Sequence, residues 1–404
     1  MVSSNETNNQ ESALVAQTLQ EGWLLKQQDL NRAIAVLEEG LRAAMASEDL
    51  LLGVIADLEL ALALIESGIN EQLQEAKSLL IVAGKKLKDC STCYQQKAYL
   101  LYCQGRWNLQ QAKFEDGVKF LNLAQKSPQL KPGLDVLVNC ALANYRANKG
   151  EFEQALPLLE QLLDRLPEED DLDRALILKQ LGLLYLLLDD HEHAAAYLEQ
   201  CLDLALHIEH KYLRIEAMAG LSHVAIAQAE YETAGMLIQE RLQIIDKPGD
   251  LSWAAYAYVD LAEAMLGAGE INDAHECIKA EVIPRFDQLQ DQRGIAKTKR
   301  VLGLIWLHKI MDGLVSLNEE TIEIAEDYLL EASMLFEQHQ MLKHYAVTLA
   351  DMARLYNISA NTQYQFQFQG KSLRSLEMAM ATLDQFEIRP PILDAQIEEL
   401  FSVI

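Results

Sequence analysis

A repeat of about 40 residues runs through most of the chain and limits it to very few architectures. Each copy is an amphipathic segment with a small residue at a matching position, where two helix backbones can approach closely. A single pair of antiparallel helices cannot bury its own apolar stripes, so successive pairs must stack. The repeat therefore predicts seven helical hairpins over residues 11–284. The equivalent small residues, separated by 43, 41, 38, 39, 40 and 40 residues, are Ala33, Ala76, Gly117, Ala155, Ala194, Ala234 and Ala274.

The composition agrees with an all-α chain and excludes several other classes. Glycine (19) and proline (8) are too scarce in 404 residues for a β-sandwich, a barrel or a disulfide scaffold, all of which need many turns. The formal charge of −27, from 34 basic and 61 acidic residues, disfavours nucleic-acid partners and anionic membranes. Because no apolar stretch approaches 18 residues and no secretory signal opens the chain, we expect a cytoplasmic protein without membrane insertion.

Two motifs carry a resemblance to a known family. The sequence reads Leu181-Gly182-x-x-Tyr185 in one segment and Gly150-x-Phe152-x-x-Ala155 in another. These residues resemble the tetratricopeptide repeat, although the period here is about 40 residues and not the family's 34. Such long units are similar to those of maltose-regulator-type sensors and kinesin light chains. The resemblance implies a right-handed superhelical solenoid whose first helices line a concave groove.

The pattern stretches near the carboxyl end. Ala325 and Ser372 are the next small positions, at spacings of 51 and 47 residues. They predict two longer hairpins over residues 285–388, with insertions at 308–321 and 357–370, which makes nine hairpins in all. An apolar stripe after Arg389-Pro390-Pro391 predicts a helix over 389–404 that caps the last hairpin. The alternative is that this helix binds in a groove of another protein. The polar residues 1–10 are expected to form a disordered tail.

No catalytic motif is complete, so we expect no enzyme activity, no cofactor and no metal site. Gly370-Lys371-Ser372 lacks the first glycine of a phosphate-binding loop, and Gly220-x-Ser222 lacks the second glycine of a nucleophile elbow. Cys90 and Cys93 form a C-x2-C pair, which we interpret as two inert thiols at a helix junction. Thr92 and Gln95 match a capping box there, so a redox or metal role stays open as the alternative.

The resemblance also assigns the groove. Counted from the Leu-Gly positions, the partner-binding residues are Asn144, Asn148, Lys179, Glu216, His223, Glu263, Lys297, Arg300 and His308. We expect Lys297, Arg300 and His308 to read an acidic segment or a terminal carboxylate, with the asparagines bonding the partner backbone. The alternative is a solvated helix start balanced by nearby acids.

Tyr364, Phe366 and Phe368 alternate with glutamines, which is typical of an extended strand and suggests an accessory binding element. The alternative places these aromatic rings back on the solenoid. Together the patterns predict a scaffold or adaptor that binds a protein or peptide. The rival hypotheses are a regulatory sensor that relays a small molecule or signal peptide to a separate effector, and an enzyme that uses Cys90 and Cys93 in thiol exchange. The sequence does not predict the oligomeric state.

Overall fold

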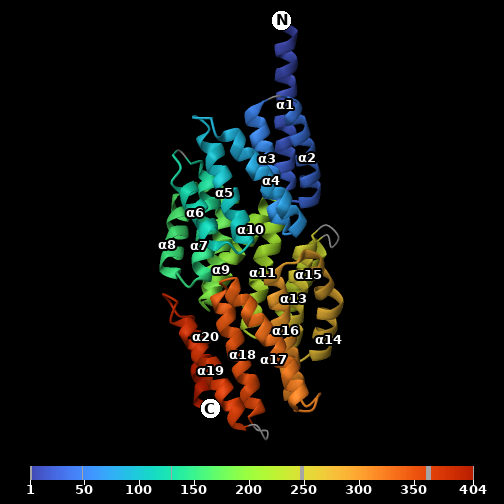
Figure 1. Ribbon diagram of the computed structural model, residues 1–404, viewed down its shortest axis with the longest axis vertical. Coiled ribbons are helices and arrows are strands. Elements are labelled where there is room, and N and C mark those ends of the chain that lie inside the picture. The colour runs from blue at the N-terminus through green and yellow to red at the C-terminus, as the bar shows by residue number, and fades with distance from the viewer. Residues whose placement is uncertain (1, 48, 129, 246–249, 361–364, 404) are drawn as a thin grey trace. The chain divides into compact units, whose positions relative to one another are not determined.

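The computed structural model describes residues 2–47, 49–128, 130–245, 250–360 and 365–403. These residues are helical almost throughout, and no strand occurs among them (Figure 1). The all-α prediction is therefore confirmed. The chain divides into two compact units, which are described separately.

The amino-terminal unit comprises Met1–Leu142, Ala205–Tyr212 and Asp246–Leu251. Consecutive helices pack as antiparallel pairs, α1 with α2, α3 with α4 and α5 with α6 (Figure 1). Helix α1 begins at Val2, so the segment expected to be a disordered tail is helical. The helices are α1 (Val2–Leu25), α2 (Leu30–Ala46), α3 (Leu50–Ser67), α4 (Asn70–Leu87), α5 (Tyr94–Gln110), α6 (Phe114–Gln125) and the first part of α7 (Pro132–Asn148).

The carboxyl-terminal unit comprises Ala143–Leu204, Leu213–Ile245 and Ser252–Ile404. Its last helix, α20, packs on α18 and α19 and buries Leu393 and Ile397. Besides the end of α7, its helices are α8 (Phe152–Arg165), α9 (Asp171–Leu187), α10 (His191–His207), α11 (Lys211–Ala227), α12 (Tyr231–Ile244), α13 (Leu251–Gly267), α14 (Ile271–Cys277), the π-helix η1 (Ile278–Val282), α15 (Ile283–Leu289), α16 (Gln292–Met311), α17 (Glu319–Gln338), α18 (Leu342–Ser359), α19 (Gln365–Leu383) and α20 (Pro391–Val403).

The small residues of the repeat mark backbone contacts, as their spacing predicts. A Cβ atom on Gly105 of α5 would lie 3.2 Å from the carbonyl oxygen of Gly117 on α6, and the reverse contact is equally tight. At Gly182 a Cβ atom would lie 3.2 Å from the carbonyl oxygen of Ala194. Larger residues at these positions would push the two helices of a hairpin apart.

The turn inside several hairpins has a recurring form. In the α9–α10 turn, Asp189 adopts a left-handed conformation (φ 59°) and the N–H of Asp190 donates to the carbonyl of Tyr185, 3.0 Å away. The same pairing recurs after α7, where Gly150 has φ 78°. This six-residue closure satisfies carbonyls that the helix end leaves without partners. It reverses the chain in few residues and sets the two helices antiparallel.

Two irregularities correct the sequence interpretation. The second helix of the seventh hairpin continues through Pro284. A proline ring inside a regular α-helix clashes with a backbone carbonyl of the preceding turn, and here the π-helical stretch η1 widens that turn directly before the proline. Residues 365–368 lie in α19, so the extended strand expected around Phe366 and Phe368 is wrong for those residues. Tyr364 and residues 361–363 lie outside the described residues, and the Phe366 side chain is likewise not described.

The segment that follows α19 contacts the turn between α7 and α8 and the start of α8, in the same unit. The Glu387 N–H donates to the Gly150 carbonyl at 3.0 Å, and the Glu387 carboxylate accepts from the Glu153 N–H at 2.8 Å. Phe386 packs edge-on against Phe152, with ring centroids 6.1 Å apart. Residues more than 230 positions apart therefore close the unit on itself.

Candidate functional site: a row of paired charges

Polar side chains follow one another along the first helices of the carboxyl-terminal unit. We call these residues the first-helix row; they come from α9, α11, α13, α16 and α18 and are Lys179, Glu216, His223, Asp260, Glu263, Lys297, Arg300, His308 and Asp351.

The row begins with two links between neighbouring hairpins. Lys179 Nζ on α9 lies 2.9 Å from Glu216 Oε2 on α11. His223 Nε2 on α11 lies 2.9 Å from Asp260 Oδ1 on α13. In both links the two bonded residues are 37 positions apart in sequence, which is nearly one repeat. The predicted residues Lys179, Glu216 and His223 are thus held by partners within the unit.

Asp260 is the most deeply buried acid of the row. Its second oxygen accepts from Arg241 Nη2 on α12 at 2.7 Å, and both residues are only 2% exposed. Burial alone would raise the pKa of Asp260, but the nearby positive charges of His223 and Arg241 and the hydrogen bond from His223 outweigh it, so this pKa lies well below its usual range. Asp260 is therefore ionised in the folded unit.

Arg300 joins three hairpins. Its Nε atom donates to Asp351 Oδ2 on α18 at 2.8 Å, and its Nη1 atom lies 3.4 Å from Glu263 Oε1 on α13. Burial would lower the pKa of Arg300, but the two carboxylates raise it above its ordinary value. The guanidinium that the sequence assigned to a partner's negative charge is thus already engaged by two acids of this chain.

Lys297 differs from Arg300, one turn earlier on α16. Its Nζ atom lies 5.6 Å from the centre of the Tyr256 ring and its charge helps to lower the pKa of Asp260, but among the described residues no carboxylate lies within ion-pair distance of it. The Tyr256 hydroxyl is turned away to donate to Asp291 Oδ2 at 2.6 Å. Lys297 is half-buried, so its charge lies on an aromatic ring at the edge of solvent.

Two histidines near Lys297 and Arg300, His308 and His344, carry little positive charge near neutral pH. Burial is the main cause that lowers the pKa of His308, and Arg354 adds to it, while Asp312 and Asp351 act in the opposite direction. His344 on α18, which the sequence did not suggest, has its pKa lowered further by burial and then by the charges of Lys297 and Arg300. Neutral imidazoles can accept as well as donate hydrogen bonds.

The asparagines lie at the end of α7 on an exposed surface. Asn148 Nδ2 donates to the Asn144 carbonyl at 2.9 Å and to Asn144 Oδ1 at 2.8 Å. The Asn144 amide N–H groups and Asn148 Oδ1 take no part in this pair. Phe368, in contrast, is buried and stacks on Tyr356 with ring centroids 6.2 Å apart, so it is a packing residue of α18 and α19.

Sequence reasoning missed Asp260, Asp351 and Arg241. A usable signal exists for the two acids, because each directly precedes the apolar-small pair of its hairpin, Leu261-Ala262 and Met352-Ala353. At that position the side chain of Asp260 or Asp351 can reach a first helix of the neighbouring hairpin. Arg241 lies on a second helix, where the repeat register predicts no groove residue.

Two kinds of feature are absent from the described residues. No group of three His, Cys, Asp or Glu side chains among them is arranged to hold a metal ion. None of the helices in the described ranges combines the length and apolarity needed to cross a membrane.

Comparison with known proteins identifies the fold. A family model described as tetratricopeptide repeat matches residues 136–206. The crystal structure of a Rap protein complexed with competence and sporulation factor is 16% identical and covers 92% of this chain and 99% of its own, with a TM-score of 0.61. Aspartyl phosphate phosphatase F from Bacillus subtilis is 14% identical and covers 89% and 93%, with a TM-score of 0.53. No curated protein matches.

At these identities the solved structures show a shared fold and nothing more. Taken with the repeat matched over residues 136–206 and with the stacked hairpins, they define the class of fold: the chain has a tetratricopeptide-like helical-repeat fold.

Proposed function

We propose that this protein is a non-enzymatic adaptor of the cytoplasm that binds an acidic peptide segment, or a peptide's terminal carboxylate, along the first-helix row. The observation that carries the proposal is the contrast between Lys297 and the other charges of the row. Arg300, Lys179 and His223 have carboxylate partners in the unit, whereas Lys297 rests on Tyr256 without one among the described residues.

This arrangement changes the role that the sequence analysis gave to Arg300. Arg300 holds Asp351 and Glu263, so it fixes the spacing of α13, α16 and α18 and leaves Lys297 as the cation that meets the ligand. His308, on the same helix as Lys297, and Asn144, near the end of α7, supply neutral hydrogen-bonding groups. The likeness to the Rap protein supports the proposal, since that protein was solved with a bound factor.

The test uses a display library of random decapeptides in two forms, with a free carboxyl terminus and with an amidated one. The intact chain is compared with Lys297→Met, and with Lys299→Met as the matched control. Lys299 lies two residues away on α16 but is paired with Glu331 at 2.6 Å. Both variants remove one charge from the same helix.

We expect the intact chain and Lys299→Met to retain the same peptides. Lys297→Met should weaken their binding about tenfold, the effect of losing one charge-assisted hydrogen bond of about 1.4 kcal/mol. If the intact chain retains no peptide, or if the two variants behave alike, the proposal is wrong.

A second candidate is a regulatory sensor. Arg300 cross-links three hairpins, so a ligand that competes for Glu263 or Asp351 would change the spacing of α13, α16 and α18. A sensor should show ligand-dependent amide-exchange protection in these helices, whereas a pure adaptor should show protection only where the peptide lies.

A further inference from the structure

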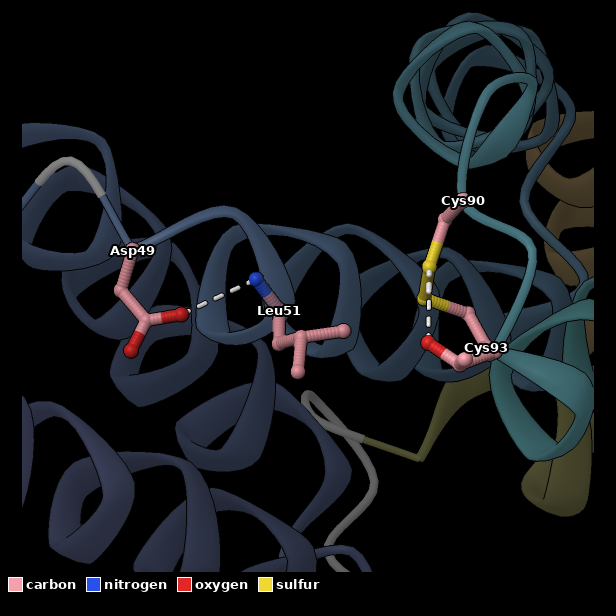
Figure 2. Close-up of a disulfide and its surroundings, with 5 residues drawn as sticks. Asp49, Leu51, Cys90 and Cys93 are labelled. Carbon is pink, nitrogen blue, oxygen red and sulfur yellow. Dashed lines mark hydrogen bonds between the residues drawn. A yellow bond between two sulfur atoms is a disulfide. The ribbon is translucent and has the colours of Figure 1, made fainter.

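Cys90 and Cys93 form a disulfide in the turn between α4 and α5 (Figure 2). Sequence reasoning favoured two inert thiols, and the structure corrects this. Helix α5 begins at Tyr94 with Cys93 as the residue before it, one position later than the predicted Thr92–Gln95 capping box requires, and the Cys93 side chain makes no capping hydrogen bond. The Cys90–Cys93 disulfide lies in the amino-terminal unit and is not part of the first-helix row.

A structural crosslink is a weak explanation for this disulfide. The stabilisation that a disulfide provides through the unfolded chain grows with the length of the loop that it closes. Here the two cysteines are three positions apart, which is among the shortest loops a disulfide can close. Helices α4 and α5 already pack against each other, and Ala98, Tyr102 and Cys103 anchor α5 in the core.

The two sulfur atoms lie in different surroundings. Cys93 is only 5% exposed, whereas Cys90 is half-buried and is followed by the exposed residues Ser91 and Thr92. An external thiol therefore reaches the Cys90 sulfur more easily. Which sulfur is attacked, and how well the other one leaves, together set the rate of thiol–disulfide exchange.

Cys93 is also the better leaving group. It precedes Tyr94, the first residue of the 17-residue helix α5, whose first backbone N–H groups have no acceptor within the helix. The N–H of Lys97 donates to the Cys93 carbonyl, so the helix starts directly at this residue. A thiolate released on Cys93 would lie next to these N–H groups, and the start of a helix stabilises negative charge.

We propose that Cys90–Cys93 is a redox-active disulfide that exchanges with external thiols by attack on Cys90. The external thiolate forms a bond to Cys90 Sγ, the Cys90–Cys93 bond breaks, and the electron pair leaves on Cys93 Sγ. A second external thiol then attacks the external sulfur of the mixed disulfide and releases Cys90. Two external thiols are oxidised to one disulfide, and their two electrons and two protons reduce the cysteine pair.

Other cysteines of the chain provide internal controls. Cys103 and Cys201 are fully buried, and burial raises the pKa of Cys103 far above its ordinary value and that of Cys201 to about 12. Neither should react in the folded protein at neutral pH.

The experiment titrates the full-length chain with reduced and oxidised glutathione in one arm and with a protein dithiol of the thioredoxin class in the other. Free thiols are trapped with a maleimide and located by peptide mass spectrometry. We expect Cys90 and Cys93 to gain label together in one two-electron transition while Cys103 and Cys201 stay unlabelled. Reduction in the second arm alone assigns the exchange to a protein dithiol.

The direction of attack is tested on the intact chain with its disulfide formed. After brief exposure to reduced glutathione and an acid quench, the glutathione mixed disulfide should lie on Cys90 at least tenfold more often than on Cys93. Equal amounts on the two cysteines would overturn the direction of attack. A disulfide that resists both reductants until the protein unfolds would overturn the proposal, as would a pair that stays thiol in oxidised glutathione; these wild-type readouts need no variant to fold.

Discussion

The buried pair of Arg241 and Asp260 allows a quantitative test of the charge pairing in the carboxyl-terminal unit. Replacing Arg241 with methionine leaves the Asp260 carboxylate buried with His223 as its remaining partner. Loss of one member of a buried ion pair costs about 3 to 5 kcal/mol. Two Arg241 nitrogens, Nε and Nη1, are buried with no hydrogen-bond partner among the described residues, which makes the intact pair less favourable. We therefore expect the lower end, about 3 kcal/mol.

The magnitude is checked by urea unfolding followed by far-UV circular dichroism. With a slope of about 3 kcal/mol per molar urea, Arg241→Met should lower the midpoint of the carboxyl-terminal unit by about 1 M. Asp260→Asn alone should cost a similar amount, because it leaves the guanidinium buried and unpaired. The double variant should recover to within about 1 kcal/mol of the wild type. Additive losses in the double variant, or a loss below about 1 kcal/mol for Arg241→Met, would refute the reasoning.

The same pair predicts a pH dependence. Because the pKa of Asp260 is lower in the folded protein than in the unfolded chain, its contribution to stability is present above about pH 4 and is lost as the pH falls further. The difference in unfolding free energy between wild type and Arg241→Met should therefore shrink from pH 7 to pH 3. A difference that stays constant over this range would contradict the assignment.

Two further predictions concern the closure of the carboxyl-terminal unit. Gly150→Ala should cost about 3 kcal/mol in urea unfolding, since its φ of 78° is left-handed and the new Cβ atom would lie 2.9 Å from the Phe386 Cα atom. The control Gly269→Ala, with φ 84° and nothing within 4 Å, should cost only about 1 kcal/mol, and equal losses would refute the contact. Glu387→Gln should cost about 1 kcal/mol by weakening the cap at the start of α8, and an unchanged midpoint would contradict that role.

Helical content and the pairing of helices could be predicted from the sequence because both follow from local periodicity. The small positions near Gly117 and Ala194 were found from spacing alone, and backbone contacts confirm their role. Stacked hairpins repeat the same local packing, so one register applies to many units. The alternation around Phe366 and Phe368 misled because a few residues of period two cannot separate a strand from the first turn of a helix, and α19 begins at Gln365.

The sequence by itself determined which residues lie on first helices, and hence Lys297 and Arg300 as candidates. Only the tertiary structure decided their roles. Arg300 meets Asp351 from 51 positions away, and Glu387 reaches the start of α8 from 234 positions away. A repeat period specifies the order of hairpins along the chain, but the partner of each charge depends on the rotation between hairpins, which arises from the packing of all of them together.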